Sequence, residues 1–346
     1  MASLVESVPN FSEGRRLDVV EKLATAVTGT PGVHLLDRTS DPSHNRSVLT
    51  LAGEARPVME ALERAVAVAV DEIDMEQHSG EHPRIGAVDV IPFVPLGDTT
   101  LPDCVRFARE FGARIAGRFD LPVYLYAAAA ARPERERLAD VRRGQYESLK
   151  VEIGQRGREP DFGPRRTHPS AGAVAVGARP FLIAYNINLE SPDVELAKRI
   201  ARRIRESGGG LPRVQANGFW IEELACAQVS MNLLDFRVTP MWKVWEMVYE
   251  EAAAEGVELR ESELIGLAPV AALLDVADHA GAPAGSAVET RLAVTARFLK
   301  LRDFSPLQAL ELRLEAAEKA AKQAREGGTR RSTRSRRSSA GRGSPG

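Results

Sequence analysis

The chain has few cysteines and no long apolar run, and these absences exclude several classes of protein. Its two cysteines, Cys104 and Cys226, are too few for the disulfide framework of a secreted domain, and neither belongs to a C-x-x-C pair. The most apolar run, 65–70, ends at Asp71, far short of the roughly 18 residues that a membrane span requires. The first ten residues lack the basic and apolar regions of a signal peptide. We therefore expect a cytoplasmic protein that does not enter a membrane.

Common nucleotide-binding and hydrolase motifs are missing as well. The sequence contains neither G-x-G-x-x-G nor G-x-S-x-G, and the glycines at 208–210 end a helical pattern without the GK[ST] of a P-loop. The formal net charge of −2 hides an asymmetry, because residues 327–346 hold six arginines and no acid. An acidic body with a basic tail is not the basic folded face of a specific nucleic-acid binder.

Short β-rich runs alternate with helical patterns, and the order β-α-β-β-α-β occurs twice. The first half has predicted strands at 4–9, 33–36, 48–51 and 88–96, with helices that start near Leu17 and Pro57. The second half has predicted strands at 181–189, 214–221, 228–233 and 264–270, with helices at 194–204 and from Met241. This order is that of the split βαβ motif. We predict an α/β (α+β) protein of two ferredoxin-like split-βαβ subdomains, whose open sheet faces pack around a ligand tunnel.

The domain prediction follows from this repeat. Residues 1–178 and 179–304 form the two subdomains, 305–326 a C-terminal helix that starts at Ser305-Pro306 and runs to about Arg325, and 327–346 a disordered basic tail. The polar, arginine-rich segment 132–172 is predicted to be a long loop that connects the halves, and loops of that length are functional or disordered.

The densest cluster of chemically useful side chains is His78-Ser79-Gly80-Glu81-His82-Pro83-Arg84-Ile85-Gly86. It contains H-x-x-E-H, a zinc pattern that requires a helix, but Gly80 and Pro83 both oppose a helix. The preferred interpretation is a rigid loop that holds the imidazole of His82 as a base, because histidine is an effective base near neutral pH. The alternative is a surface loop whose histidine has only a structural role.

Two further polar segments stand out. In Asp41-Pro42-Ser43-His44-Asn45-Arg46-Ser47, between two predicted strands, Asn45 and Arg46 can bind an anion, although the pattern favours a solvated hairpin loop. The segment 160–172 is so rich in proline and glycine that its backbone can approach a planar ligand closely, although by itself it is also compatible with a linker. Cys104 falls on the apolar side of a helix, which favours a core position.

Several segments taken together closely resemble the glutamate formimidoyltransferase family. They are Leu4-Val5-Glu6-Ser7-Val8-Pro9-Asn10-Phe11-Ser12-Glu13-Gly14, Ile73-Asp74-Met75, Gly80-Glu81-His82-Pro83-Arg84-Ile85-Gly86-Ala87, Val123-Tyr124-Leu125-Tyr126, Pro160-Asp161-Phe162-Gly163-Pro164 and Gln228-Val229-Ser230-Met231-Asn232-Leu233. The resemblance covers about residues 3–300. Animal members of the family carry a fused cyclodeaminase domain, and this chain is expected to be a stand-alone transferase without it.

The resemblance implies an activity and a set of site residues. The family transfers a formimino group from N-formimino-L-glutamate to N5 of tetrahydrofolate, which is a co-substrate, and no metal is expected. The catalytic histidine of the family corresponds to His82. The chemistry of the donor adds further candidates: Glu81 or Asp89 can stabilise its cationic formimino group, and Arg84 or Arg46, with Asn45, can bind its carboxylates. The folate-binding stretch corresponds to Gly163, Pro164, Arg165, Arg166, Thr167, His168, Pro169, Ser170, Ala171 and Gly172. A homodimer is expected, because members of the family associate.

Two other functions stay open at this point. One is a transferase that uses 5-formyltetrahydrofolate or formylglutamate, because the same pocket can accept a formyl donor. The other is a folate-binding protein without catalysis, although the intact H-S-G-E-H-P-R-I-G loop counts against it.

Overall fold

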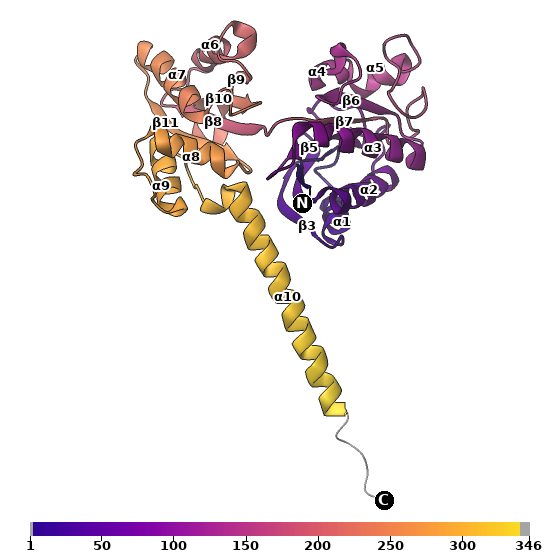
Figure 1. Cartoon of the computed structure of the whole chain (residues 1–346). Helices are drawn as coiled ribbons and strands as arrows, with labels where there is room; N and C mark the ends of the chain where they lie inside the picture. Colours follow the sequence, from indigo (N-terminus) through magenta and orange to yellow (C-terminus); the bar gives the residue numbers. More distant parts are fainter. Residues whose placement is uncertain (1–2, 340–346) are drawn as a thin grey trace, which may run out of the picture.

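The computed structural model describes residues 3–339, with side chains up to residue 324, as two lobes that each contain one β-sheet (Figure 1). The first lobe is built from β1 (Leu4–Ser7), β2 (Asn10–Phe11), α1 (Leu17–Thr28), β3 (Val33–Asp41), β4 (Arg46–Glu54), α2 (Ala55–Glu72), β5 (Val88–Pro95), α3 (Leu101–Phe119), β6 (Val123–Ala127), α4 (Leu138–Val141), α5 (Gln145–Glu152) and β7 (Val174–Ala178). The second contains β8 (Ile183–Leu189), α6 (Val194–Ile204), β9 (Val214–Ile221), β10 (Cys226–Leu233), α7 (Met241–Ala254), β11 (Leu259–Ile265), α8 (Val270–His279) and α9 (Val288–Phe298), followed by α10 (Leu310–Ser339).

The chain is a mixed α/β protein with two sheets. The second lobe has the predicted order β-α-β-β-α-β, whereas the first has β1 and β2 in place of one predicted strand and continues after β5 with α3, β6, α4, α5 and β7. The first sheet is mixed and has seven strands, in the order β1-β4-β2-β5-β7-β6, with β3 outside β4. The second is antiparallel and has four strands, in the order β11-β8-β10-β9. Within residues 3–339, no helix combines the length and the apolar character needed to cross a membrane.

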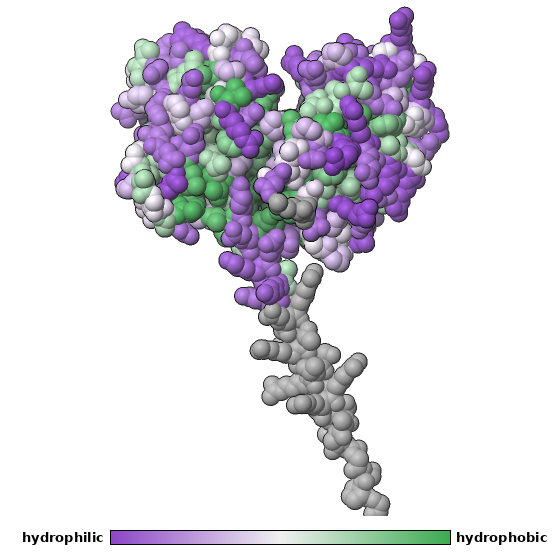
Figure 2. Space-filling model, viewed as in Figure 1, coloured by the Kyte–Doolittle hydropathy of each residue, from purple (hydrophilic) through white to green (hydrophobic). Residues whose placement is uncertain are grey.

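The first sheet packs both against helices of its own lobe and against the second lobe. One face packs against α1, α2 and α3 through a cluster that includes Phe11, Leu62 and Phe111. Three other residues of the first sheet pack against the second lobe, as part of its apolar cluster: Leu36, Ala52 and Val94. The two lobes are therefore joined by apolar packing at their base, whereas Figure 2 shows a notch between them on the side away from α10.

The segment 132–172 corrects the sequence-based prediction of a connecting loop. It contains α4 and α5, whose Val141 and Leu149 pack with Tyr124 and Tyr126 of β6 in a third apolar cluster. Helices this short leave almost no periodicity in the sequence, which is why the prediction missed them. Because β7 still belongs to the first sheet, the connection between the sheets is the short segment 179–182.

The C-terminal part of the second lobe also differs from the prediction. The predicted strand 264–270 is displaced: β11 ends at Ile265, Gly266 adopts a φ of +71°, and α8 begins at Val270 after Pro269. Charged Arg260, Glu261 and Glu263 lie between the buried residues of β11 and hide its alternation.

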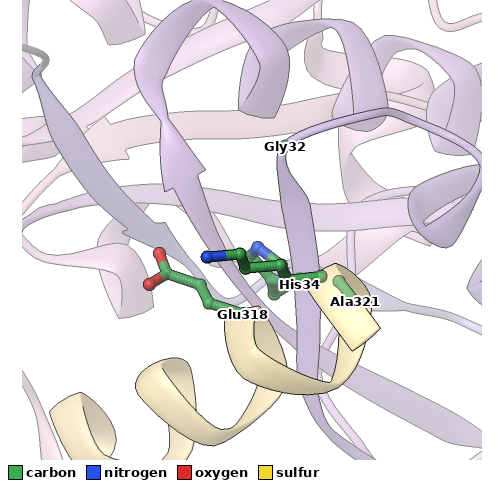
Figure 3. A pocket seen from close by; sticks show the side chains of 5 residues that line it. Gly32, His34, Glu318 and Ala321 are labelled. Carbon is green, nitrogen blue, oxygen red and sulfur yellow. The ribbon is translucent and has the colours of Figure 1, made fainter. Parts of the chain in front are cut away.

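The last helix, α10, extends away from the body and continues past Arg325, the residue near which it was predicted to end (Figure 1). Part of the segment predicted to be a disordered tail is thus helical, whereas 340–346 lies outside the described residues. Near the start of α10, Arg313 Nε donates to the carbonyl oxygen of Leu36 at 2.9 Å. A pocket of about 210 Å³ separates α10 from β3, next to His34 and Glu318 (Figure 3).

Candidate active site

The loop that carries His82 is held at both ends by glycines. A Cβ atom on Gly80 would lie 2.4 Å from the carbonyl oxygen of His44, and one on Gly86 would lie 2.0 Å from that of Ala173. No larger residue fits at either position without a shift of the backbone that it would meet. The loop 78–86 is not helical, so the H-x-x-E-H pattern lacks the geometry on which a zinc interpretation depends.

The turn between β3 and β4 packs directly against this loop. Asn45 has a φ of 47°, in the left-handed region that asparagine tolerates better than most residues. Its Oδ1 accepts from the backbone N–H of Gly14 at 3.0 Å, and its Nδ2 donates to the carbonyl oxygen of Ser79 at 2.9 Å. Asn45 is therefore engaged in joining three chain segments. The structure thus brings together the two polar clusters that were separate in the sequence.

His82 itself is half-buried beside a second histidine. The ring centroids of His82 and His44 are 6.4 Å apart with an edge-on arrangement, and Nδ1 of His44 lies 2.7 Å from Oδ2 of Asp41. Burial and the positive charges of Arg46 and Arg142 together lower the pKa of His82 from 6.5 to about 3. His82 is therefore neutral at physiological pH and has a free lone pair that can accept a proton.

Arg84 lies on the same loop and is buried, with 6% of its surface exposed, and its guanidinium group connects the loop to neighbouring segments. Its Nη2 and Nη1 donate to the two carboxylate oxygens of Glu147 in α5, at 2.6 and 2.9 Å, and Nη1 also donates to Gln145 at 2.9 Å. Its Nε donates to Nδ1 of His78 at 3.2 Å, and Nε2 of His78 donates to the carbonyl oxygen of Asn45 at 3.1 Å. This network connects α5, the loop and the β3–β4 turn, so Arg84 has few donors left for a ligand.

Asp89 and Glu81 lie in opposite environments. Asp89 is 1% exposed; its Oδ1 accepts from the backbone N–H of Ile85 at 3.0 Å, and its Oδ2 is ion-paired with Arg142. Glu81 is exposed, and its backbone N–H donates to the carbonyl oxygen of Ser43 at 3.4 Å. Of the two carboxylates named in the sequence analysis, only that of Glu81 is open to solvent.

Arg142 is the residue beside His82 that sequence reasoning missed. It caps the C-terminus of α4, inside the segment that had been interpreted as a connector rich in arginine. Nothing local distinguishes Arg142 from Arg143 in the sequence. Only the packing of α4 against the first sheet turns Arg142 toward Asp89.

The predicted folate-binding stretch divides into two parts in the structure. Its end touches the His82 loop: the backbone N–H of Ala173 donates to Ile85 at 3.0 Å, and that of Ala87 donates to Ala171 at 2.9 Å. His168 shapes this end, because its Nδ1 accepts from the N–H of Ala171 at 3.0 Å. The beginning of the stretch lies at the C-terminal end of α3. There Gly163 approaches the backbone of Leu121, and Arg166 is ion-paired with Asp120.

Comparison with known proteins agrees with this arrangement. The model of the N-terminal subdomain of the formiminotransferase domain matches residues 4–179, and the model of the formiminotransferase domain matches residues 184–304. The chain belongs to the formiminotransferase domain family. The resemblance inferred from the sequence is thereby confirmed.

Relatives with this domain are similar over most of the chain. A glutamate formimidoyltransferase of Streptococcus pyogenes is 45% identical over 81% of this chain and 93% of its own length. A glutamate formimidoyltransferase of Thermoplasma acidophilum is 47% identical over 80% of this chain and 92% of its own length. The formimidoyltransferase-cyclodeaminase of Rattus norvegicus is 46% identical over 80% of this chain, which corresponds to 52% of the longer rat protein. The solved structure of pitrilysin aligns with 89% of this chain and 39% of its own chain at 9% identity, with a TM-score of only 0.18.

Proposed function

We propose that this protein transfers the formimino group from N-formimino-L-glutamate to N5 of tetrahydrofolate, with His82 as the general base. The observation that carries the proposal is a neutral, half-buried imidazole in a loop fixed between the β3–β4 turn and residues 171–173. Its membership of the formiminotransferase domain family, and relatives named glutamate formimidoyltransferase at 45% and 47% identity, support the choice of reaction.

The proposed mechanism moves one proton through His82. N5 of tetrahydrofolate attacks the formimino carbon and forms the new C–N bond, while the lone pair of His82 takes the proton that N5 loses. The bond between that carbon and the glutamate nitrogen then breaks, and His82 returns the proton to the departing nitrogen. Tetrahydrofolate is the co-substrate, and these proton transfers need no metal. Binding both substrates side by side supplies the proximity contribution to the rate.

The other predicted site residues take different proposed roles. Arg84 and Asn45 hold the loop through the contacts described above, and Asp89 fixes the backbone after His82. Exposed Glu81 is proposed to face the cationic formimino group of the donor. Residues 163–172 are proposed to bind folate, with 168–172 nearest to His82, because these residues contact the same loop.

We also propose the finer architecture that this function requires: two ferredoxin-like split-βαβ subdomains, 1–178 and 179–304, around a tunnel between their sheets. The strand order β11-β8-β10-β9 supports this architecture, as does the position of β1 and β2 between β4 and β5.

Association as a homodimer in the cytoplasm completes the proposal. The edge strand β9 carries no charged residue and exposes Phe219 and Trp220, whereas charges line β11 at the opposite edge. Natural proteins protect exposed edges with charges, so an uncharged edge supports pairing with a second copy. Phe219→Lys should convert a dimer to a monomer in sedimentation equilibrium, and a dimer that survives this change would place the interface elsewhere.

The decisive assay incubates purified protein with tetrahydrofolate and formiminoglutamate, and in parallel with formylglutamate, and measures the release of glutamate. We expect release with the formimino donor. Release only with formylglutamate would support the formyl transferase, and release with neither would support a folate-binding protein. His82→Ala should lower the rate by about 10²–10⁴-fold while folate affinity is retained. His34→Ala, which is next to α10, is the matched control and should not change the rate (Figure 3).

A further inference from the structure

Positively charged side chains dominate the electrostatic surroundings of His82, because Arg46, Arg142, His44 and Arg84 all lower its pKa. Arg142 is paired with Asp89, and Arg84 with Glu147. Arg46 has no carboxylate oxygen within 4 Å of its guanidinium in the part of the chain that the structure describes. Burial lowers the pKa of Arg46, and the charge of Arg142 lowers it further. An unpaired, partly buried guanidinium is costly, and a bound anion removes that cost.

Arg142 also has an unused donor. Its Nε is buried, and it makes no hydrogen bond within the described residues, although Nη2 of the same side chain is paired with Asp89. A buried N–H without a protein partner costs free energy unless a water molecule or a ligand accepts from it, so Nε of Arg142 is available to a bound anion. Arg46 and Arg142 approach His82 from two different elements, the start of β4 and the end of α4.

We propose that Arg46 and Arg142 together bind the carboxylates of a dicarboxylate donor and that the bound carboxylates make His82 a stronger base. The inference rests on the proposed function for the identity of the donor, and it names Arg142 as a residue that determines donor specificity. Arg84 has no part in the recognition, because Glu147, Gln145 and His78 already occupy its donors.

The coupling between donor and base follows from Coulomb's law. Four groups oppose protonation of His82 through their positive charge: Arg46, Arg142, His44 and Arg84. A carboxylate bound to Arg46 and Arg142 offsets the two largest of these charges, so the pKa of His82 rises when the donor binds. The imidazole is then neutral in the free enzyme and gains proton affinity only in the complex, where a proton has to be moved.

Glutarate is a suitable probe, because it carries two carboxylates and no transferable group. Its dissociation constant is measured by calorimetry, and the protonation of His82 is followed by ¹H–¹⁵N NMR of the imidazole nitrogens with and without saturating glutarate. We expect the pKa of His82 to rise by at least one pH unit with glutarate. Arg46→Gln and Arg142→Lys should each weaken glutarate binding about tenfold or more, as expected for a lost charge-assisted hydrogen bond. Both variants should keep the affinity for tetrahydrofolate.

Arg143→Gln is the matched control, because it removes the same charge one residue further along the chain, at an exposed position, and should leave glutarate binding unchanged. Arg142→Lys retains a charge for Asp89, so a folding defect is avoided. Equal glutarate affinity in the wild type and both variants, or no change in the protonation of His82, would overturn the inference even if formimino transfer is observed. If glutarate binds as expected but the protein transfers no formimino group, the anion site is upheld and the proposed function is rejected.

Discussion

Replacing Gly86 with alanine tests how the His82 loop is fixed to the first sheet. The added Cβ atom would lie 2.0 Å from the carbonyl oxygen of Ala173 and 2.5 Å from that of Ala171, whereas an ordinary contact begins at 3.4 Å. Both atoms belong to backbone, so no side-chain rotation relieves the overlap. Either the loop or residues 171–173 must move by more than roughly an ångström, as happens in an overpacked core.

The expected cost follows from the bonds that such a movement strains. The N–H groups of Ala173 and Ala87 donate across this junction to Ile85 and Ala171, at 3.0 and 2.9 Å. Two strained hydrogen bonds at about 1 kcal/mol each and an overpacking cost of about 1–3 kcal/mol give about 3–5 kcal/mol. A displacement of this size beside the reacting groups should also lower kcat by about a hundredfold.

Urea unfolding gives the free energy of unfolding of the variant, and the formimino transfer assay gives its kcat. Gly117→Ala is the control, because Gly117 lies on the exposed side of α3 with nothing within 4 Å of an added Cβ. It should raise the free energy of unfolding by about 0.5–1 kcal/mol. A Gly86→Ala protein with the stability and kcat of the wild type would refute the argument that this junction positions the loop.

Three further predictions concern other parts of the structure. Burial raises the pKa of Glu6 from 4.5 to about 8, so the folded state holds a proton there that the unfolded state has lost. The free energy of unfolding should therefore fall between about pH 4.5 and 8, by up to about 1.4 kcal/mol per pH unit, and urea unfolding of Glu6→Gln should lack this part of the slope. Arg84→Lys loses the paired contact with Glu147 and should cost about 1–3 kcal/mol, whereas Arg137→Lys, at an exposed ion pair, should change stability by less than about 0.5 kcal/mol; equal effects would contradict this connecting role of Arg84. Burial raises the pKa of the Cys104 thiol to about 12, so a thiol reagent at pH 8 should label it only after denaturation, and rapid labelling of the native protein would place it outside the core.

Much of the fold follows from the sequence, because burial imposes periodic patterns on local stretches of chain. The buried positions of α1, such as Val20, Leu23 and Val27, recur at helical spacing, and β5 is a continuous apolar strand. The same logic failed where charged residues interrupt the pattern, as in β11, and where helices are too short to show a period, as in α4 and α5. The candidate site followed from a resemblance of motifs, which identified the His82 loop, and from the polar segment that contains Asn45 and Arg46, whereas Arg142 was missed.

By itself the sequence therefore determined most of the helices and strands of the two sheets, the family resemblance and the position of His82 as the candidate base. Only the tertiary structure decided which side chains surround it. Arg142 lies 60 residues from His82 in the chain and differs from Arg143 in no local respect, yet the packing of α4 directs it to Asp89. Arg84, which the sequence offered as a ligand for carboxylates, is instead occupied by Glu147. Charge and burial around a residue come from segments distant in sequence, so the protonation state of His82 could not be inferred before the fold was known.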